Sequence, residues 1–238
     1  MKREQIDKLQ LEKLKEAAKI FLKPMERLPF PVVIEAMTGR QVIPYIEEDD
    51  GELMAALAGS CIKTVNDSEK TPVEANRPND VSTKVEKMLQ GNLSDSGITA
   101  ERPKPQGKQR ASAQGYPDLL LWDADRPTYL EVKVSRVENI SKGSARNFFY
   151  QPTKNSKIAH PARHLLCGFS IEEAGEKMWV LREWTVTDLW FLRVKLKPEY
   201  NADNLEIYRR EAVILKGDGK NITTPQSAAR DKTPPNHL

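Results

Sequence analysis

Two short apolar runs, separated by a polar segment, restrict the fold of this chain more than any other feature. The first run covers residues 118–122 (Asp-Leu-Leu-Leu-Trp), and the second covers residues 128–134 (Thr-Tyr-Leu-Glu-Val-Lys-Val). The segment between them, Asp-Ala-Asp-Arg-Pro, has the composition of a turn. Apolar runs that flank a turn in this way predict two strands paired as an antiparallel hairpin.

Side chains alternate along a strand, so each face of this hairpin has its own composition. The face expected to join the core carries Leu119, Leu121, Leu130, Val132 and Val134. The opposite face carries Asp118, Leu120, Trp122, Tyr129, Glu131 and Lys133. If the turn is centred between Ala124 and Asp125, Asp118 lies across from Glu131, with Cβ atoms about 5 Å apart. Two carboxylates and one ammonium then meet on one face.

Opposed carboxylates repel each other, and a divalent cation relieves that repulsion. Mg²⁺ prefers oxygen ligands and often takes only one or two carboxylates, with water and phosphate oxygens completing its shell. The spacing therefore favours a Mg²⁺ site made by Asp118, Glu131 and the carbonyl of Val132. Lys133 would orient the attacking water or stabilise the transition state of phosphodiester hydrolysis. The alternative interpretation is a surface hairpin on which Lys133 merely neutralises two acids.

The rest of the chain supplies helices before this hairpin and strands after it. Apolar spacing predicts helices over residues 5–22, 51–65 and 80–89. In the third, Val81, Val85, Met88 and Leu89 face the core, Asn79 or Asp80 caps the start, and Gly91 ends the helix. Residues 66–79 and 103–115 are expected to be loops. Further strands are expected at 98–102, 165–171, 179–184 and 191–196, and a helical segment at 144–150.

Pro117-Asp118, twelve intervening residues and then Glu131-Val132-Lys133 resemble the PD-(D/E)xK nuclease signature. The resemblance covers roughly residues 79–185, because that family's core is a helix, three strands, a helix and a further strand. It implies an α/β fold with a restriction-endonuclease-like core, in which a central mixed β-sheet is flanked by helices. The expected domains are an N-terminal helical elaboration (1–78), the nuclease core with C-terminal strands (79–215) and a disordered tail (216–238).

Carried onto this chain, the resemblance implies that Asp118 and Glu131 are metal ligands and that Lys133 is the catalytic lysine. Many members of the family add an acid from the helix before the sheet, and Glu86 matches that position best. The alternative interpretation of Glu86 is an ordinary exposed helix glutamate. Glu52 is a weaker match.

The size of the chain and the elaboration on both sides of its core are similar to a Type II restriction endonuclease. The resemblance implies Mg²⁺-dependent, site-specific cleavage of double-stranded DNA, a homodimer, and a cognate DNA methyltransferase encoded nearby. Two alternatives stay open. One is a structure-directed nuclease of the same fold, such as a repair or mobile-element enzyme, and the other is a non-catalytic DNA-binding relative.

Charge is informative through its distribution, because the net charge of the whole chain is only +3. Residues 136–163 hold a local excess of cations, which favours contact with phosphates. The residues predicted to bind DNA are Lys142, Arg146, Lys154, Lys157 and Arg163, and a solvated face is the alternative. The two cysteines indicate neither a disulfide framework nor a zinc cluster. A charged N-terminus and the absence of a long apolar run favour a cytoplasmic protein.

Overall fold

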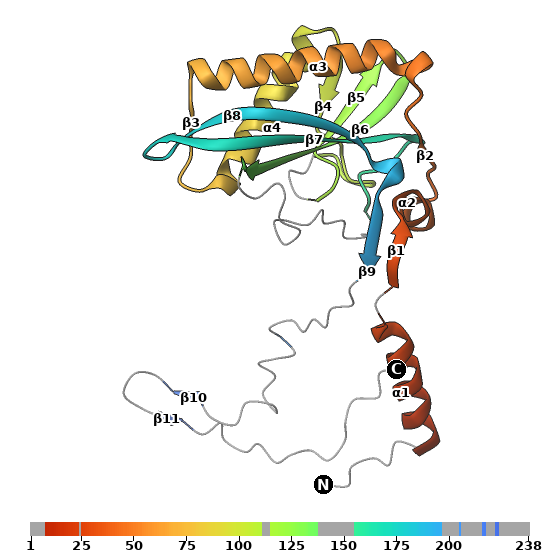
Figure 1. Ribbon diagram of the computed structural model, residues 1–238. Helices are drawn as coiled ribbons and strands as arrows, with labels where there is room; N and C mark the ends of the chain where they lie inside the picture. Colours follow the sequence, from red (N-terminus) through yellow and green to blue (C-terminus); the bar gives the residue numbers. More distant parts are fainter. Residues whose placement is uncertain are drawn as a thin grey trace. The chain divides into compact units, whose positions relative to one another are not determined.

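The computed structural model describes residues 8–23, 25–110, 115–137 and 155–196, together with residue 205 and the pairs 216–217 and 222–223 (Figure 1). The chain separates into two compact units. The larger unit is Arg27–Val194, and the smaller one combines Met1–Glu26 with Lys195–Leu238. The predicted hairpin lies in the larger unit.

A seven-stranded mixed sheet forms the centre of the larger unit (Figure 1). Its strands, in spatial order, are β3 (Val73–Glu74), β8 (Met178–Asp188), β7 (Ala162–Gly175), β6 (Arg126–Arg136), β5 (Leu119–Asp123) and β4 (Thr99–Glu101), and β2 (Val42–Ile43) pairs with β7 beside this row. β7 runs parallel to β6 and to β2, whereas the other neighbours are antiparallel. The predicted fold class, a central mixed sheet flanked by helices, is confirmed.

Two helices, α3 (Glu47–Lys70) and α4 (Pro78–Asp95), cover one face of the sheet (Figure 1). In α4 an apolar residue recurs at every fourth position and is fully buried: Val81, Val85, Leu89 and Leu93. These side chains pack against the apolar face of the hairpin, which contributes Leu119, Leu121, Leu130, Val132 and Val134. The alternation predicted for the hairpin therefore places the main core on the expected side.

The opposite face of the sheet has a second, smaller core. Phe30 and Ile34 of α2 (Phe30–Thr38) pack there with Leu120 and Tyr129 of the hairpin, and Leu189 of the 3-10 helix η2 (Leu189–Phe191) joins them. The face that carries Asp118 and Glu131 is thus partly covered by apolar side chains. Glu131 is buried there, whereas Asp118 and Lys133 are partly exposed.

The helix expected over 80–89 is longer at both ends and is not capped as predicted. Its N-cap is Arg77 without a side-chain cap hydrogen bond, and Pro78 occupies the first turn, where a missing N–H costs nothing. Gly91 does not end the helix, because the following turn buries Leu93. The chain instead leaves α4 at Ser96, and Gly97 adopts φ +85°.

α3 also extends beyond its predicted range of 51–65. Four acidic residues, Glu47 to Asp50, form its first turn, where negative charge interacts favourably with the helix dipole. Asp50 Oδ2 accepts a hydrogen bond from the backbone N–H of Ile46, at 3.0 Å. The loop predicted over 66–79 is therefore wrong in part, since this range contains the last turn of α3, β3 and the start of α4.

The predicted strands after the hairpin are present but longer, except the last. Residues 165–171 and 179–184 lie inside β7 and β8. Before the hairpin, the strand expected at 98–102 is present as the shorter β4. The range 191–196 holds the end of η2 and then β9 (Arg193–Leu196), which pairs with β1 (Met25–Pro29). The helical segment expected at 144–150 lies outside the described residues.

α3 and β3, which lie in the expected N-terminal helical elaboration (1–78), contribute residues to the main core of the sheet. In the smaller unit, the predicted N-terminal helix is α1 (Lys8–Leu22), and β10 (Lys216–Gly217) pairs with β11 (Ile222–Thr223). The rest of the predicted tail, 216–238, lies outside the described residues. None of the described helices combines the length and the apolar composition needed to cross a membrane.

Candidate active site

The hairpin has the register that brings its two acidic positions together. Leu119 pairs with Leu130, and the pairing continues to Asp123 and Arg126 across the turn. Asp118 directly precedes β5, and the same register places it opposite Glu131. The antiparallel pairing and its predicted centre between Ala124 and Asp125 are confirmed.

Each of the three hairpin side chains has a defined contact. The backbone N–H of Val132 donates to Asp118 Oδ2 at 2.8 Å, which ties the Asp118 carboxylate to β6. Lys133 Nζ donates to Glu131 Oε1 at 2.6 Å. The other carboxylate oxygen, Glu131 Oε2, is buried and has no hydrogen-bond partner in the described part of the chain. A buried carboxylate oxygen without a donor is costly unless a cation or another donor occupies the space beside it.

Glu86, on α4, belongs to the same cluster of charge. It is buried rather than exposed, with 8% of its surface accessible, so the alternative interpretation as an exposed glutamate is wrong. Burial and the charge of Asp118 raise its pKa, and the Arg102 guanidinium, 2.6 Å from Glu86 Oε1, opposes that effect. Glu52, the weaker match, is exposed on α3.

The pKa of Glu131 reflects its burial and the charges that lie near it. Burial raises the pKa of Glu131 to about 7, and the Asp118 charge adds to the shift. Lys133 and Lys157 act in the opposite direction without cancelling it. The two ammonium groups therefore do not offset the cost of burying the charge of Glu131.

This donor set fits a magnesium ion held by few protein ligands. Among the residues that the structure describes, no three His, Cys, Asp or Glu side chains are arranged to enclose a metal. The charge of Asp118 nevertheless acts on Glu131, and Glu131 offers a buried oxygen without a donor in the described part of the chain. Mg²⁺ commonly uses one or two carboxylates and fills the remaining positions with water and phosphate oxygens.

Glu131→Gln is expected to raise the free energy of unfolding of the metal-free protein near pH 8 by about 1–2 kcal/mol. The folded-state pKa of about 7 exceeds the ordinary value of 4.5, so the folded state prefers the protonated carboxyl. Stability from this group is complete below about pH 4.5 and is lost as the pH rises through about 7. Urea denaturation with EDTA near pH 8 and pH 5 measures the difference. An equal effect at both pH values would contradict this origin.

Two of the basic residues predicted to bind DNA are buried inside the protein. Arg163 forms a buried ion pair with Asp50, and 4% of its surface is exposed. Lys157 is 5% exposed, and its ammonium donates to backbone carbonyls. Neither is available to neutralise a DNA phosphate. Lys142, Arg146 and Lys154 lie outside the described residues.

The position of Lys157 is the feature that sequence reasoning missed. Burial lowers the pKa of Lys157, while the charges of Asp118, Glu131 and Glu86 raise it, so its ammonium lies near all three carboxylates. Pattern alone gives no signal for this, because an isolated lysine after a polar segment is typical of a solvent-exposed position.

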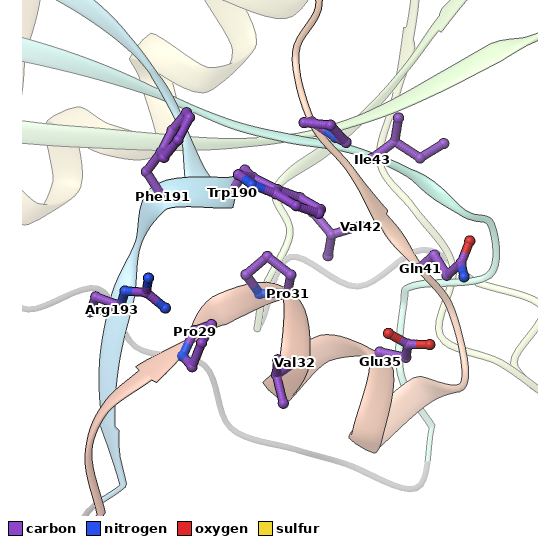
Figure 2. A pocket seen from close by; sticks show the side chains of 11 residues that line it. Pro29, Pro31, Val32, Glu35, Gln41, Val42, Ile43, Trp190, Phe191 and Arg193 are labelled. Atoms are coloured by element: carbon purple, nitrogen blue, oxygen red, sulfur yellow. The ribbon is translucent and has the colours of Figure 1, made fainter.

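A separate pocket of about 670 Å³ lies between α2, β2 and η2 (Figure 2). Figure 2 shows the rings of Trp190 and Phe191 on one side and Pro31 and Val32 of α2 on another. The residues that line this pocket include none of Asp118, Glu131, Lys133 or Glu86. It is therefore distinct from the acidic cluster.

Comparisons with known proteins agree with the chemistry of this cluster. The model of the Type II restriction enzyme MjaV family matches residues 24–211. The chain is 29% identical over 232 residues to the Type II restriction enzyme MjaV of Methanocaldococcus jannaschii, an alignment that covers 90% of this chain and 99% of that protein. No solved structure shows significant similarity to the present chain. Type II restriction enzymes are endodeoxyribonucleases, as the resemblance implied, and the chain belongs to the Type II restriction enzyme MjaV family.

Proposed function

We propose that this chain hydrolyses double-stranded DNA at a specific sequence and that it requires Mg²⁺. The observation that carries the proposal is the register that sets Asp118 opposite Glu131, with Lys133 2.6 Å from Glu131 and with Glu131 Oε2 buried and unpartnered among the described residues. Family membership supports a site-specific DNA endonuclease. The fit of the donor set to few-ligand oxygen coordination supports Mg²⁺.

Asp118 and Glu131 would hold the metal, with the carbonyl of Val132 as a further ligand. A bound Mg²⁺ supplies Lewis-acid polarisation of the phosphodiester and a lowered pKa for bound water. The N–H of Val132 would fix the Asp118 carboxylate by donating to its Oδ2. Lys133 Nζ would fix the Glu131 carboxylate by donating to its Oε1. Glu86 adds a third negative charge from α4, and Arg102 limits its repulsion.

Lys133 would serve the reaction directly. Its side chain is 35% exposed, whereas that of Glu131 is 5% exposed, so the ammonium lies where the buried site opens to solvent. At that place it can orient a water molecule or stabilise negative charge that develops on the phosphate. Because this contribution is larger in the transition state than in the bound state, turnover depends on Lys133 more than DNA binding does.

The assembly that acts on DNA is also a proposal. A homodimer, in which each copy cuts one strand of a palindromic site, matches what the resemblance implies. A restriction enzyme also needs a cognate DNA methyltransferase, encoded nearby, that protects the host. Both are tested by solution mass measurement and by cleavage of methylated and unmethylated genomic DNA.

The first experiment compares the purified full chain with Lys133→Ala on unmethylated phage DNA, with Mg²⁺ and with EDTA. We expect discrete fragments only with Mg²⁺, and a rate lower by roughly 10²–10³-fold in the variant. Lys70→Ala, an exposed lysine at the end of α3, is the matched control. A smear would indicate a non-specific or structure-directed nuclease. Branched DNA is tested in parallel as a second substrate. Failure to cleave either DNA under any condition would overturn the proposal.

A further inference from the structure

We propose that Lys157 is a positioning residue that clamps the loop before β5 and thereby fixes Asp118 in the metal site. This inference rests on the proposed function, because it assigns Lys157 a role at the same site. The structural basis is a pair of hydrogen bonds: Lys157 Nζ donates to Gly115 O at 2.6 Å and to Pro117 O at 2.9 Å. Pro117 directly precedes Asp118, so the second bond acts one residue from the metal ligand.

Hydrogen bonds also fix the backbone on both sides of Lys157. The N–H of Gln106 donates to Ser156 O, and its side-chain amide donates to Ile158 O, both at 2.9 Å. On the other side, Tyr129 Oη accepts the N–H of Ala159 at 2.7 Å. The backbone on both sides of Lys157 is therefore bound to neighbouring parts of the unit, including β6, the strand that carries Glu131.

A further hydrogen bond also holds this loop. Tyr116 Oη and His164 Nδ1, on β7, share a buried hydrogen bond of 2.6 Å. The loop from Gly115 to Asp118 is thus held by its backbone through Lys157 and by a side chain through His164. Fixing such a loop from outside the ligand set keeps a metal ligand in its productive position.

Burying the charged ammonium of Lys157 costs more free energy than burying a neutral hydrogen-bond donor would. Burial penalises its charge, but three carboxylates, Asp118, Glu131 and Glu86, act in its favour. A buried ammonium is retained where its donors and charge are both used, since an apolar side chain would remove the Lys157 donor from the carbonyls of Gly115 and Pro117. The same ammonium reduces the mutual repulsion of the carboxylates before a cation binds.

Two roles are separable, because they predict opposite effects on cation binding. If Lys157 acted only as a compensating positive charge, its removal would strengthen binding of a divalent cation. If it holds Asp118 in position, its removal displaces a ligand and weakens that binding. The second effect requires the Asp118 carboxylate, so it disappears when Asp118 is already neutral.

The test is a double-mutant cycle with the full chain, in which free Mn²⁺ is measured by electron paramagnetic resonance. Lys157→Met is expected to raise the Kd for Mn²⁺ by about 10- to 100-fold in the wild-type background. In the Asp118→Asn background, the same change is expected not to raise the Kd, because only the effect of removing the Lys157 charge is then left. In cleavage assays, kcat should fall while KM for DNA stays unchanged. Lys70→Met serves as the control and should match the wild type.

Lys157→Arg keeps the charge and offers several N–H donors, so it is expected to retain more of the Mn²⁺ affinity than Lys157→Met does. If Lys157→Met does not fold, Lys157→Gln, which is neutral and retains an amide donor, replaces it in the cycle. If a folded Lys157 variant with Asp118 intact showed an unchanged or lower Kd for Mn²⁺, the proposed role of Lys157 would be overturned. Equal weakening in both Asp118 backgrounds would overturn it too. A wild-type chain that neither binds Mn²⁺ nor cleaves DNA would instead overturn the proposed function.

Discussion

Asp118→Asn is expected to reduce the rate of DNA cleavage by roughly three orders of magnitude, which corresponds to about 4 kcal/mol of transition-state stabilisation. Asparagine has the shape of aspartate, and its amide oxygen can accept the hydrogen bond from Val132 N–H that Asp118 Oδ2 now accepts. What is lost is a negative oxygen ligand opposite Glu131. Single-turnover cleavage with saturating Mg²⁺ measures the effect, and circular dichroism checks the fold.

Asp125→Asn is the matched control, since Asp125 lies in the turn of the same hairpin and is exposed. This variant should cleave at the wild-type rate. Glu131→Gln should resemble Asp118→Asn in activity while it stabilises the metal-free fold. Full activity in either site variant would refute the assignment of the two acids as metal ligands.

Arg163→Ala is expected to lower the free energy of unfolding by about 3–5 kcal/mol, because it leaves a buried charge without its partner. Arg163 pairs with Asp50, and each side chain is 5% exposed. A second cation, Arg126, lies 3.4 Å from the same oxygen of Asp50 but is 45% exposed, so solvent weakens its compensation. The buried pair joins the N-terminus of α3 to β7, and guanidinium denaturation at neutral pH measures the loss.

Arg182→Ala is the control for this prediction. Arg182 pairs with Glu172 and Glu69, but its side chain is 44% exposed, so the loss should stay below about 1 kcal/mol. The double variant Arg163→Met with Asp50→Leu should recover much of the lost stability, because no charge is then left buried. Equal losses in Arg163→Ala and Arg182→Ala would show that the buried pair contributes no more than a surface pair.

The buried pair also explains why a charge count misleads in this chain. Arg163 belongs to the cationic stretch that indicates DNA contact by sequence, yet its partner, Asp50, is 113 positions away. Lys157, in the same stretch, faces inward for a similar reason: its partners, Gly115 and Pro117, are 42 and 40 positions away. A local pattern contains no information on such partners.

The hairpin, its register and the face of each of its side chains follow from the amino-acid sequence alone. Turn composition and the alternation of apolar residues are properties of neighbours within about a dozen positions, and they suffice to place Asp118 opposite Glu131. Lys133 follows on the same strand. Because these rules are local, the order of residues is enough to indicate the hairpin and its acidic face. The mixed sheet and the enzyme class come instead from the resemblance of the Pro117-Asp118 and Glu131-Val132-Lys133 segments to a known nuclease signature.

Which other charges join the site depends on long-range packing. Packing of α4 through Val85 and Leu89 turns Glu86 toward Asp118 rather than toward solvent. The hydrogen bonds of Gln106 hold the backbone on both sides of Lys157, and the ammonium of Lys157 lies near the same acids. Whether a charged side chain is buried depends on whether distant segments provide its partner, because an unpaired charge would stay in water. The two acids of the hairpin can therefore be predicted from the sequence. The residues that shift their pKa values or fix their positions are determined by the tertiary packing of the core.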